Sequence, residues 1–148
     1  MELLIQQLFI GALMIVVTVF IHSIALDIII HRADQWAVRY RRIFRRIWKS
    51  VMISKVVLAI FITHIVIIWL WALLYLFLEC APLSNLHDAL YFASVVYSTL
   101  GFGDIILEDS CRMLSGIQGA NGFILFGWTS AFIFEVVGQI YRKEAESL

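Results

Sequence analysis

Proline and charged residues are scarce in this sequence. The 148 residues include a single proline, Pro82, and 15% of them are charged, whereas soluble domains contain about 25% charged residues. No Ser- or Gly-rich linker divides the chain, so no separate soluble domain is expected. Hydrophobic residues make up 62% of the chain, and its mean hydropathy is +0.92. These values exclude an ordinary soluble protein and indicate a small membrane protein.

Catalytic and metal-binding motifs are also missing. The sequence contains no nucleophile–base pair and no phosphate-binding loop, and its four histidines do not have the spacing of metal ligands: His22, His31, His64 and His87. An enzyme is therefore not expected. Neither a cofactor nor a nucleic-acid partner is predicted.

Three long apolar stretches are present, at residues 3–30, 51–78 and 113–141. About 20 such residues cross the hydrocarbon core of a bilayer as a helix. The first stretch lacks the basic start and the small-residue cleavage site of a signal peptide, so we expect a retained helix. The sequence predicts an all-α membrane protein with an N-terminal transmembrane helix at 1–31, a basic cytoplasmic interfacial segment at 32–50 and a further two-span unit at 51–148.

The basic residues are clustered between the first two spans. Seven of the eleven lysines and arginines lie between Arg32 and Lys49. Because short basic loops stay in the cytoplasm, we expect the N-terminus and the loop 79–112 outside a cell membrane, either plasma or bacterial inner. The C-terminus is then cytoplasmic. Five arginines of this segment are expected to contact anionic lipid headgroups: Arg39, Arg41, Arg42, Arg45 and Arg46.

The outer loop contains the most informative motif, Thr-Leu-Gly-Phe-Gly-Asp at residues 99–104. Its two glycines can adopt backbone angles that other residues avoid, so successive carbonyls can face one line. Rings of such carbonyls replace the hydration shell of a cation in a membrane pore. A short helix is predicted before the motif, at 85–98, with Asn85 or Ser84 as its N-cap. A re-entrant helix and loop of this kind need surrounding protein or water.

The motif resembles the selectivity filter of the potassium-channel family, and the stretch from residue 51 to residue 141 resembles that family's pore module. The resemblance implies a passive ion channel with an outer helix at 51–79, a pore helix at 85–98, a filter at 99–104 and an inner helix at 113–141. Potassium is the implied permeant ion. Its implied ligands are the carbonyls of Thr99, Leu100, Gly101 and Phe102, in an ion-coordinating strand that Gly103 completes. Because the motif occurs once, four copies are needed, which implies a homotetrameric pore.

Two residues depart from the family's usual filter sequence. Leu100 replaces a usual valine, and Ser98, which supports the filter, replaces a usual threonine. A potassium-selective channel is the leading hypothesis, and these changes leave open a poorly selective monovalent cation channel. A non-conducting membrane scaffold or regulatory subunit with a pore-like loop is a third alternative. Asp104 is expected to support the filter by hydrogen bonding to Tyr91 of the pore helix. The side chains of Leu100 and Phe102 are expected to pack behind the filter strand.

The predicted inner helix carries an aromatic face and central glycines. By the resemblance, one helical face lines the pore, and Phe134 on this face forms a gate near the cytoplasmic constriction. The alternative is that this face packs on the outer helix. Its members are Phe123, Phe126, Ser130 and Phe134. Gly122 and Gly127 serve either as gating hinges or in helix packing.

Other positions of this region also have alternative interpretations. Asn121 either faces the pore cavity or bonds the back of the filter. Glu135 pairs with Arg46 or with Arg142.

The two cysteines, Cys80 and Cys111, bracket the outer loop. They lie on the side that we expect to be oxidising, where they either form a disulfide or remain free thiols. Inward-rectifier channels carry a similar flanking pair, so the resemblance favours the disulfide.

Overall fold

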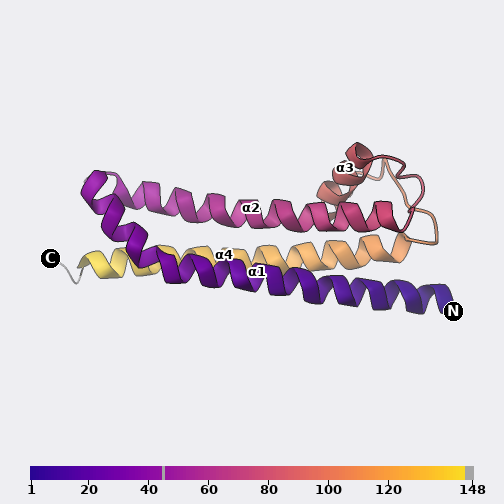
Figure 1. The fold of residues 1–148 in the computed structure, drawn as a ribbon, viewed down its shortest axis with the longest axis horizontal. Helices are drawn as coiled ribbons and strands as arrows, with labels where there is room; N and C mark the ends of the chain where they lie inside the picture. The colour runs from indigo at the N-terminus through magenta and orange to yellow at the C-terminus, as the bar shows by residue number, and fades with distance from the viewer. Residues whose placement is uncertain (45, 146–148) are drawn as a thin grey trace.

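A computed structural model describes residues 1–44 and 46–145 of the chain. In these ranges the chain forms four helices and no strand (Figure 1): α1 (Glu2–Ile43), α2 (Trp48–Phe77), α3 (Leu86–Tyr97) and α4 (Arg112–Ala145). Three segments of this described part are long and apolar enough to cross a membrane: Glu2–Ala33, Trp48–Phe77 and Arg112–Arg142. The predicted all-α fold with three membrane-spanning helices is therefore confirmed.

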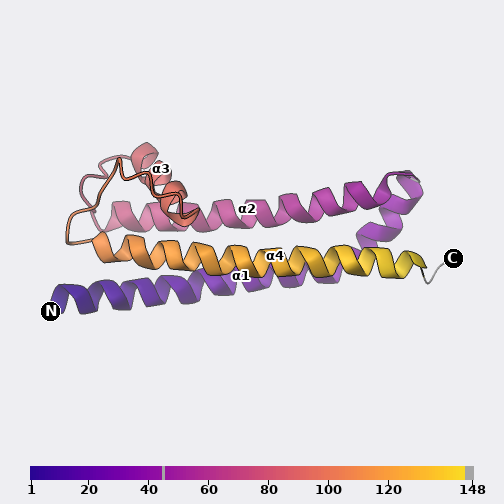
Figure 2. The same cartoon turned by 180° about the vertical axis from the view of Figure 1, so that it is seen from behind.

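The three long helices lie side by side. Helices α1 and α4 run in the same direction and α2 runs in the opposite one (Figures 1 and 2). The short helix α3 lies beside the end of α2, at the end of the bundle that holds the N-terminus. From the C-terminal end of α3 the chain returns toward the end of the bundle that holds the N-terminus, and α4 begins there (Figure 2). This arrangement places residues 98–111 in a loop between two spanning helices.

Helix α1 is longer than the sequence indicated. We expected the first helix to end at residue 31, with a separate basic segment at 32–50, but α1 continues to Ile43. No glycine or proline occurs in this stretch to stop the helix. The backbone N–H of Phe44 still donates to the carbonyl of Tyr40, at 2.8 Å, and α2 then begins at Trp48. Arg45 lies outside the described residues.

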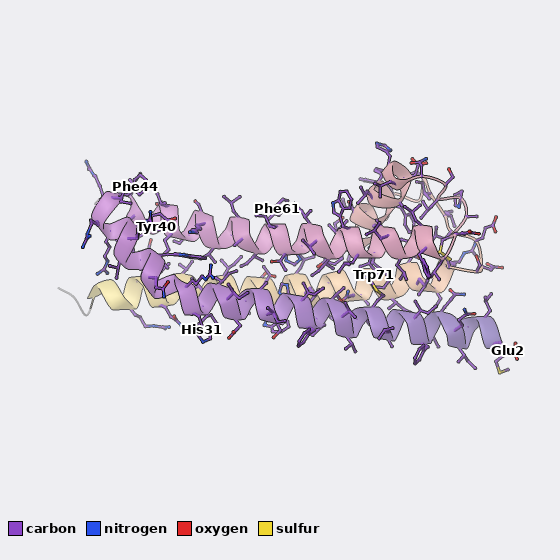
Figure 3. The ribbon with its side chains drawn as sticks, in the orientation of Figure 1. Glu2, His31, Tyr40, Phe44, Phe61 and Trp71 are labelled. Atoms are coloured by element: carbon purple, nitrogen blue, oxygen red, sulfur yellow. A yellow bond between two sulfur atoms is a disulfide. The ribbon has the colours of Figure 1, made fainter. Side chains whose placement is uncertain are left out.

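The buried apolar residues form two clusters, one at each end of the bundle. The first holds α3 against the long helices, and its aromatic members are Trp71 and Tyr75 of α2 and Phe92 and Tyr97 of α3. The second joins the other ends of α1, α2 and α4, through Leu26, Trp48, Met52, Ile60 and Val136 among others. Many large apolar side chains point outward instead, as Phe61 does in contrast to the buried Trp71 (Figure 3). This outer surface suits lipid.

Candidate ion-conduction site

The first part of the site is the helix that precedes the predicted filter. Asn85 caps α3, because its side-chain oxygen accepts a hydrogen bond from the backbone N–H of Asp88 at 2.9 Å. The amide of Asn85 in turn donates to the Asp88 carboxylate at 2.7 Å. Of the two candidate caps, Asn85 therefore holds this role. A carboxylate in the first turn also suits the helix dipole, so two local features determine where α3 begins.

The chain reverses direction directly after α3. The N–H of Thr99 donates to the carbonyl of Val96 at 2.9 Å, and the N–H groups of Leu100 and Gly101 both donate to the carbonyl of Val95, at 3.1 and 3.4 Å. Thr99 has a φ of +61°, and Gly101 and Gly103 have φ values of +55° and +77°. Glycine adopts this left-handed region without steric cost, so both glycines of the motif occupy positions that favour glycine.

The carbonyls of the predicted filter have no hydrogen-bond partner in the described part of the chain. In the described ranges, no hydrogen bond reaches the carbonyl oxygens of residues 99–103, and all five residues are exposed. A backbone carbonyl without a protein partner is satisfied by water or by another ligand. The N–H groups at the start of this segment point back to α3, while the carbonyls remain available as a row of oxygen ligands.

The two large side chains of this segment are uncovered within one chain. Leu100 is 63% exposed and Phe102 is 65% exposed. The expectation that they pack behind the strand is therefore not met by the chain's own residues. In the described ranges, the backbone hydrogen bonds of residues 99–101 go to α3 alone, through the carbonyls of Val95 and Val96.

Asp104 is tied to α3 by a hydrogen bond. The Tyr91 hydroxyl donates to the Asp104 carboxylate at 2.6 Å. This bond holds the pKa of the Asp104 carboxyl below its ordinary value and raises the pKa of Tyr91. Stability from the bond is thus present at neutral pH and is lost as the pH falls through the lowered pKa of Asp104. Ser98, in contrast, donates to the carbonyl of Ser94 at 2.8 Å and so supports the end of α3.

Helix α4 packs closely against the C-terminal end of α3. A Cβ placed on Gly122 would collide with the backbone carbonyl of Tyr97, the last residue of α3. A Cβ on Gly119 would lie 3.6 Å from the carbonyl of Val96, an ordinary contact. A Cβ on Gly127 would meet nothing within 4 Å. Glycine at 122 is therefore required by close helix packing, whatever its role in bending.

The predicted pore face of α4 is mostly unpacked within one chain. Phe123 and Phe134 are 71% and 82% exposed, and Ser130 is also exposed. Phe126 is partly covered, because the centroid of its ring lies 4.8 Å from that of the His64 ring and 5.2 Å from that of the Tyr97 ring. The face is thus available to line a pore between several copies of the chain. Phe126 also packs against the His64 and Tyr97 rings inside its own chain.

Asn121 faces neither the cavity nor the filter, and both of its predicted roles are wrong. It is 1% exposed, and its amide donates to the Thr18 hydroxyl of α1 at 2.8 Å. Both alternatives failed because they left out the first helix, which packs directly on α4 at this depth. Glu135 pairs with Arg142 at 2.8 Å, which selects one of its two candidate partners.

Several buried polar residues in the spans were not singled out from the sequence. Gln7 of α1 accepts from the N–H of Met113 at 3.0 Å and donates to the carbonyl of Asp109 at 2.9 Å, so it anchors the start of α4. Tyr75 donates to Gln118 at 2.8 Å, and Gln118 donates to the carbonyl of Ala93 at 3.0 Å. A signal for them was present, since polar residues in an apolar span usually face protein.

The two cysteines form a disulfide across the outer loop. Cys80 and Cys111 are joined with a Cα–Cα distance of 5.7 Å and a sequence separation of 31. A bridge over a loop of this length is worth roughly 3–4 kcal/mol in the chain-entropy model. It ties the end of α2 to the start of α4, and α3 and the predicted filter lie within the closed loop.

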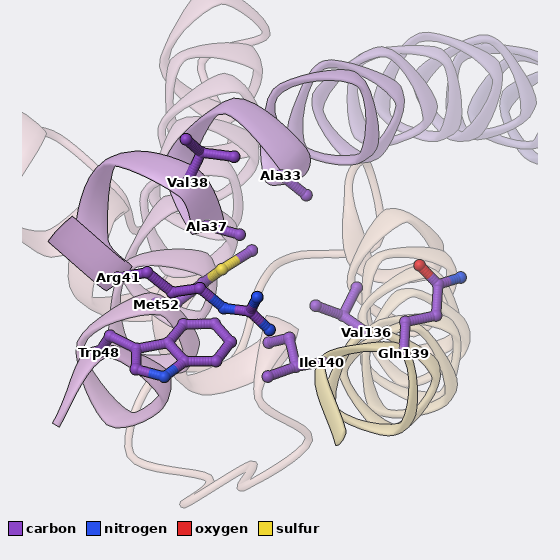
Figure 4. Close-up of a pocket in the computed structure, with 9 residues that line it drawn as sticks. All are labelled: Ala33, Ala37, Val38, Arg41, Trp48, Met52, Val136, Gln139 and Ile140. Carbon is purple, nitrogen blue, oxygen red and sulfur yellow. The ribbon is translucent and has the colours of Figure 1, made fainter. Parts of the chain in front are cut away.

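At the opposite end of the bundle, basic residues of α1 and α2 contact aromatic rings. Arg41 lies over the Trp48 ring, with its Cζ 4.5 Å from the centroid. Both residues border a cavity of about 190 Å³ between α1, α2 and α4 (Figure 4). Lys55 of α2 lies 3.9 Å from the centroid of the Trp36 ring and donates to the Tyr40 hydroxyl at 3.1 Å. These cation–π contacts hold the end of α1 against α2.

Comparison with known proteins identifies the class of this site. No curated protein and no solved structure matches the chain. A family model described as an ion channel matches residues 51–139, which include α3, the loop 98–111 and most of α2 and α4. This match covers more than half of the chain. The protein therefore belongs to this ion-channel family, of the potassium-channel type, with an additional N-terminal helix.

Proposed function

We propose that the protein is a homotetrameric channel that conducts potassium passively through a filter at residues 99–104. One observation carries this proposal: the carbonyls of residues 99–103 have no partner in the described chain, directly after a helix whose C-terminal end points toward them. A helix C-terminus carries partial negative charge and favours a cation. The ligands would be the carbonyls of Thr99, Leu100, Gly101 and Phe102, with Gly103 at the end of the strand.

The tetramer is supported by what one chain leaves uncovered. The carbonyls of one chain cannot surround an ion. In the pores of this family, carbonyls from several subunits form rings around it. The exposed side chains of Leu100 and Phe102 would be covered by neighbouring copies, and the exposed face of Phe123 and Phe134 would border the pore between them. These surfaces lie on the filter loop and on α4, so one assembly would account for both.

Orientation follows from the basic end of α1. If this end lies on the cytoplasmic side of a cell membrane, the N-terminus and the filter loop lie on the outer side. This orientation agrees with the positive-inside rule and with the disulfide. Of the five arginines expected to contact lipid, the four that the structure describes are exposed: Arg39, Arg41, Arg42 and Arg46. They would contact anionic headgroups.

The function is tested with purified protein in planar bilayers. With potassium and sodium on opposite sides, we expect a reversal potential that follows the potassium gradient, and empty bilayers as the control carry no such current. A reversal potential near zero would instead assign a poorly selective cation channel. Absence of current from assembled protein would assign a scaffold. Bilayers with and without anionic lipid test the arginine contacts in the same recordings.

A gate at Phe134 gives a separate prediction. Four Phe134 rings near the cytoplasmic end of α4 would close the pore by excluding water, and the ring is 82% exposed in one chain. Phe134→Ala is expected to raise the open probability severalfold in single-channel recordings. Phe61→Ala, which shortens a 61% exposed ring on the outside of α2, is the matched control. An unchanged open probability in Phe134→Ala would rule out this gate.

A further inference from the structure

Four buried polar side chains, one from each helix, meet in the interior of the bundle. They are His22 of α1, His64 of α2, Tyr97 of α3 and Thr129 of α4, and they are between 0% and 8% exposed. The Tyr97 oxygen lies 2.8 Å from Nδ1 of His64. The Thr129 oxygen lies 2.9 Å from Nε2 of His64 and 3.3 Å from Nε2 of His22. The four groups thus form one continuous chain of hydrogen bonds.

The direction of these hydrogen bonds follows from counting protons. A neutral imidazole has one N–H donor and one acceptor. If Tyr97 donates to Nδ1 of His64, then His64 donates from Nε2 to Thr129, and Thr129 donates to His22. Every proton of these groups is then used except the N–H on Nδ1 of His22, an atom that is buried without a partner among the described residues.

The reverse direction is less favourable. If His64 donated to Tyr97, the Tyr97 O–H would have no acceptor among the described contacts, and Nδ1 of His22 would still have no partner. An unmade hydrogen bond in an apolar interior is costly. We therefore infer that the chain starts at Tyr97 as a donor and ends at His22 as an acceptor. Thr129 is the link between them.

Tyr97 connects this hydrogen-bond chain to the filter. It is the last residue of α3, two positions before Thr99, and its carbonyl contacts Gly122 of α4. The Phe126 ring packs on both Tyr97 and His64, on the side of the proposed pore face. A displacement of the Tyr97 side chain would therefore move the inner end of the carbonyl row.

We propose that His22, Thr129 and His64 are positioning residues that hold Tyr97 through this hydrogen-bond chain, and that ion discrimination by the filter thereby depends on the first helix. This inference rests on the proposed function. It gives the additional helix α1 a role in conduction, whereas a match over residues 51–139 alone assigns it none. A purely structural role would affect the yield of tetramer, while a positioning role affects the ratio of potassium to sodium permeability.

The test compares two substitutions at Thr129. Thr129→Val keeps the shape but removes the hydroxyl that joins the two histidines, and Thr129→Ser retains the hydroxyl. We expect Thr129→Val to lower the permeability ratio of potassium over sodium by roughly tenfold, the scale of a lost buried hydrogen bond, and Thr129→Ser to restore it. The matched control is Thr63→Val on α2, because among the described residues the Thr63 hydroxyl bonds only the carbonyl of Ala59 in its own helix, at 3.1 Å.

Tyr97→Phe provides a second, independent variant. It removes one hydroxyl from a packed ring, and its permeability ratio should fall to that of Thr129→Val. The double variant should show no further loss, because both changes break the same chain of bonds. The proposal is overturned by a wild-type ratio in Thr129→Val, by a serine variant as poor as the valine variant, or by additive losses. A wild-type channel that does not prefer potassium would contradict the proposed function itself, and this inference with it.

Discussion

Gly101→Ala is expected to abolish potassium flux while the protein still assembles. Gly101 has a φ of +55°, a region that costs a residue with a Cβ about 1–2 kcal/mol. A Cβ at this position would meet nothing within 4 Å, so within the chain the effect comes from the backbone angle alone. In the proposed tetramer the cost occurs four times around one ring, about 4–8 kcal/mol in all. A change of this size removes well over 99% of the conducting conformation.

Gly116→Ala is the matched control for this result. Gly116 also has open space within 4 Å of an added Cβ, but it lies in α4 and has no positive φ. Alanine at this position should favour the helix by about 1 kcal/mol and retain flux. Flux of potassium into liposomes, normalised to the amount of tetramer, measures both variants. If Gly101→Ala conducts as well as Gly116→Ala does, residues 99–103 do not form the ion path.

The sequence predicted the features that depend on local pattern. The three spans, the short helix before the motif, its capping by Asn85 as one of two candidates, and a candidate partner for Asp104 all follow from residues close together along the chain. The extension of α1 to Ile43 was missed, because the positive charges suggested a boundary where no helix-breaking residue is present. Charge places a segment relative to the membrane, but it does not end a helix.

The contacts between helices could not be predicted, because they depend on how the helices face one another. Asn121 was assigned to the pore or the filter, whereas it bonds Thr18 of α1. His22 and His64 are far apart in sequence and lack metal-ligand spacing, yet the centroids of their rings lie 5.2 Å apart. The resemblance to a pore module covers residues 51–141 alone, so it implies no partner for the polar residues of the first helix. An apolar span that retains glutamine, threonine and histidine is itself a sign of packing against protein.

Gly122→Ala is expected to be the most damaging change in α4. The added methyl group would collide with the backbone carbonyl of Tyr97, which cannot rotate away as a flexible side chain can. Helices α3 and α4 must then separate, and overpacking of this kind costs about 1–3 kcal/mol in each chain. We expect a smaller fraction of tetramer, a lower midpoint of thermal unfolding, and loss of flux in the protein that does assemble.

Gly119→Ala separates this packing effect from a general effect of alanine in α4. Gly119 lies one helical turn before Gly122, and its added Cβ would be at 3.6 Å from the carbonyl of Val96, a distance that needs no rearrangement. Its tetramer fraction and unfolding midpoint should therefore stay near wild type. Gly127→Ala tests the hinge interpretation, because within the described chain its Cβ meets nothing within 4 Å, so the change acts on helix bending rather than on packing between α3 and α4. Equal stability of Gly122→Ala and Gly119→Ala would show that α3 and α4 do not pack as closely as described. A gating change in Gly127→Ala alone would place the hinge at 127 and leave Gly122 with the role of admitting the Tyr97 carbonyl.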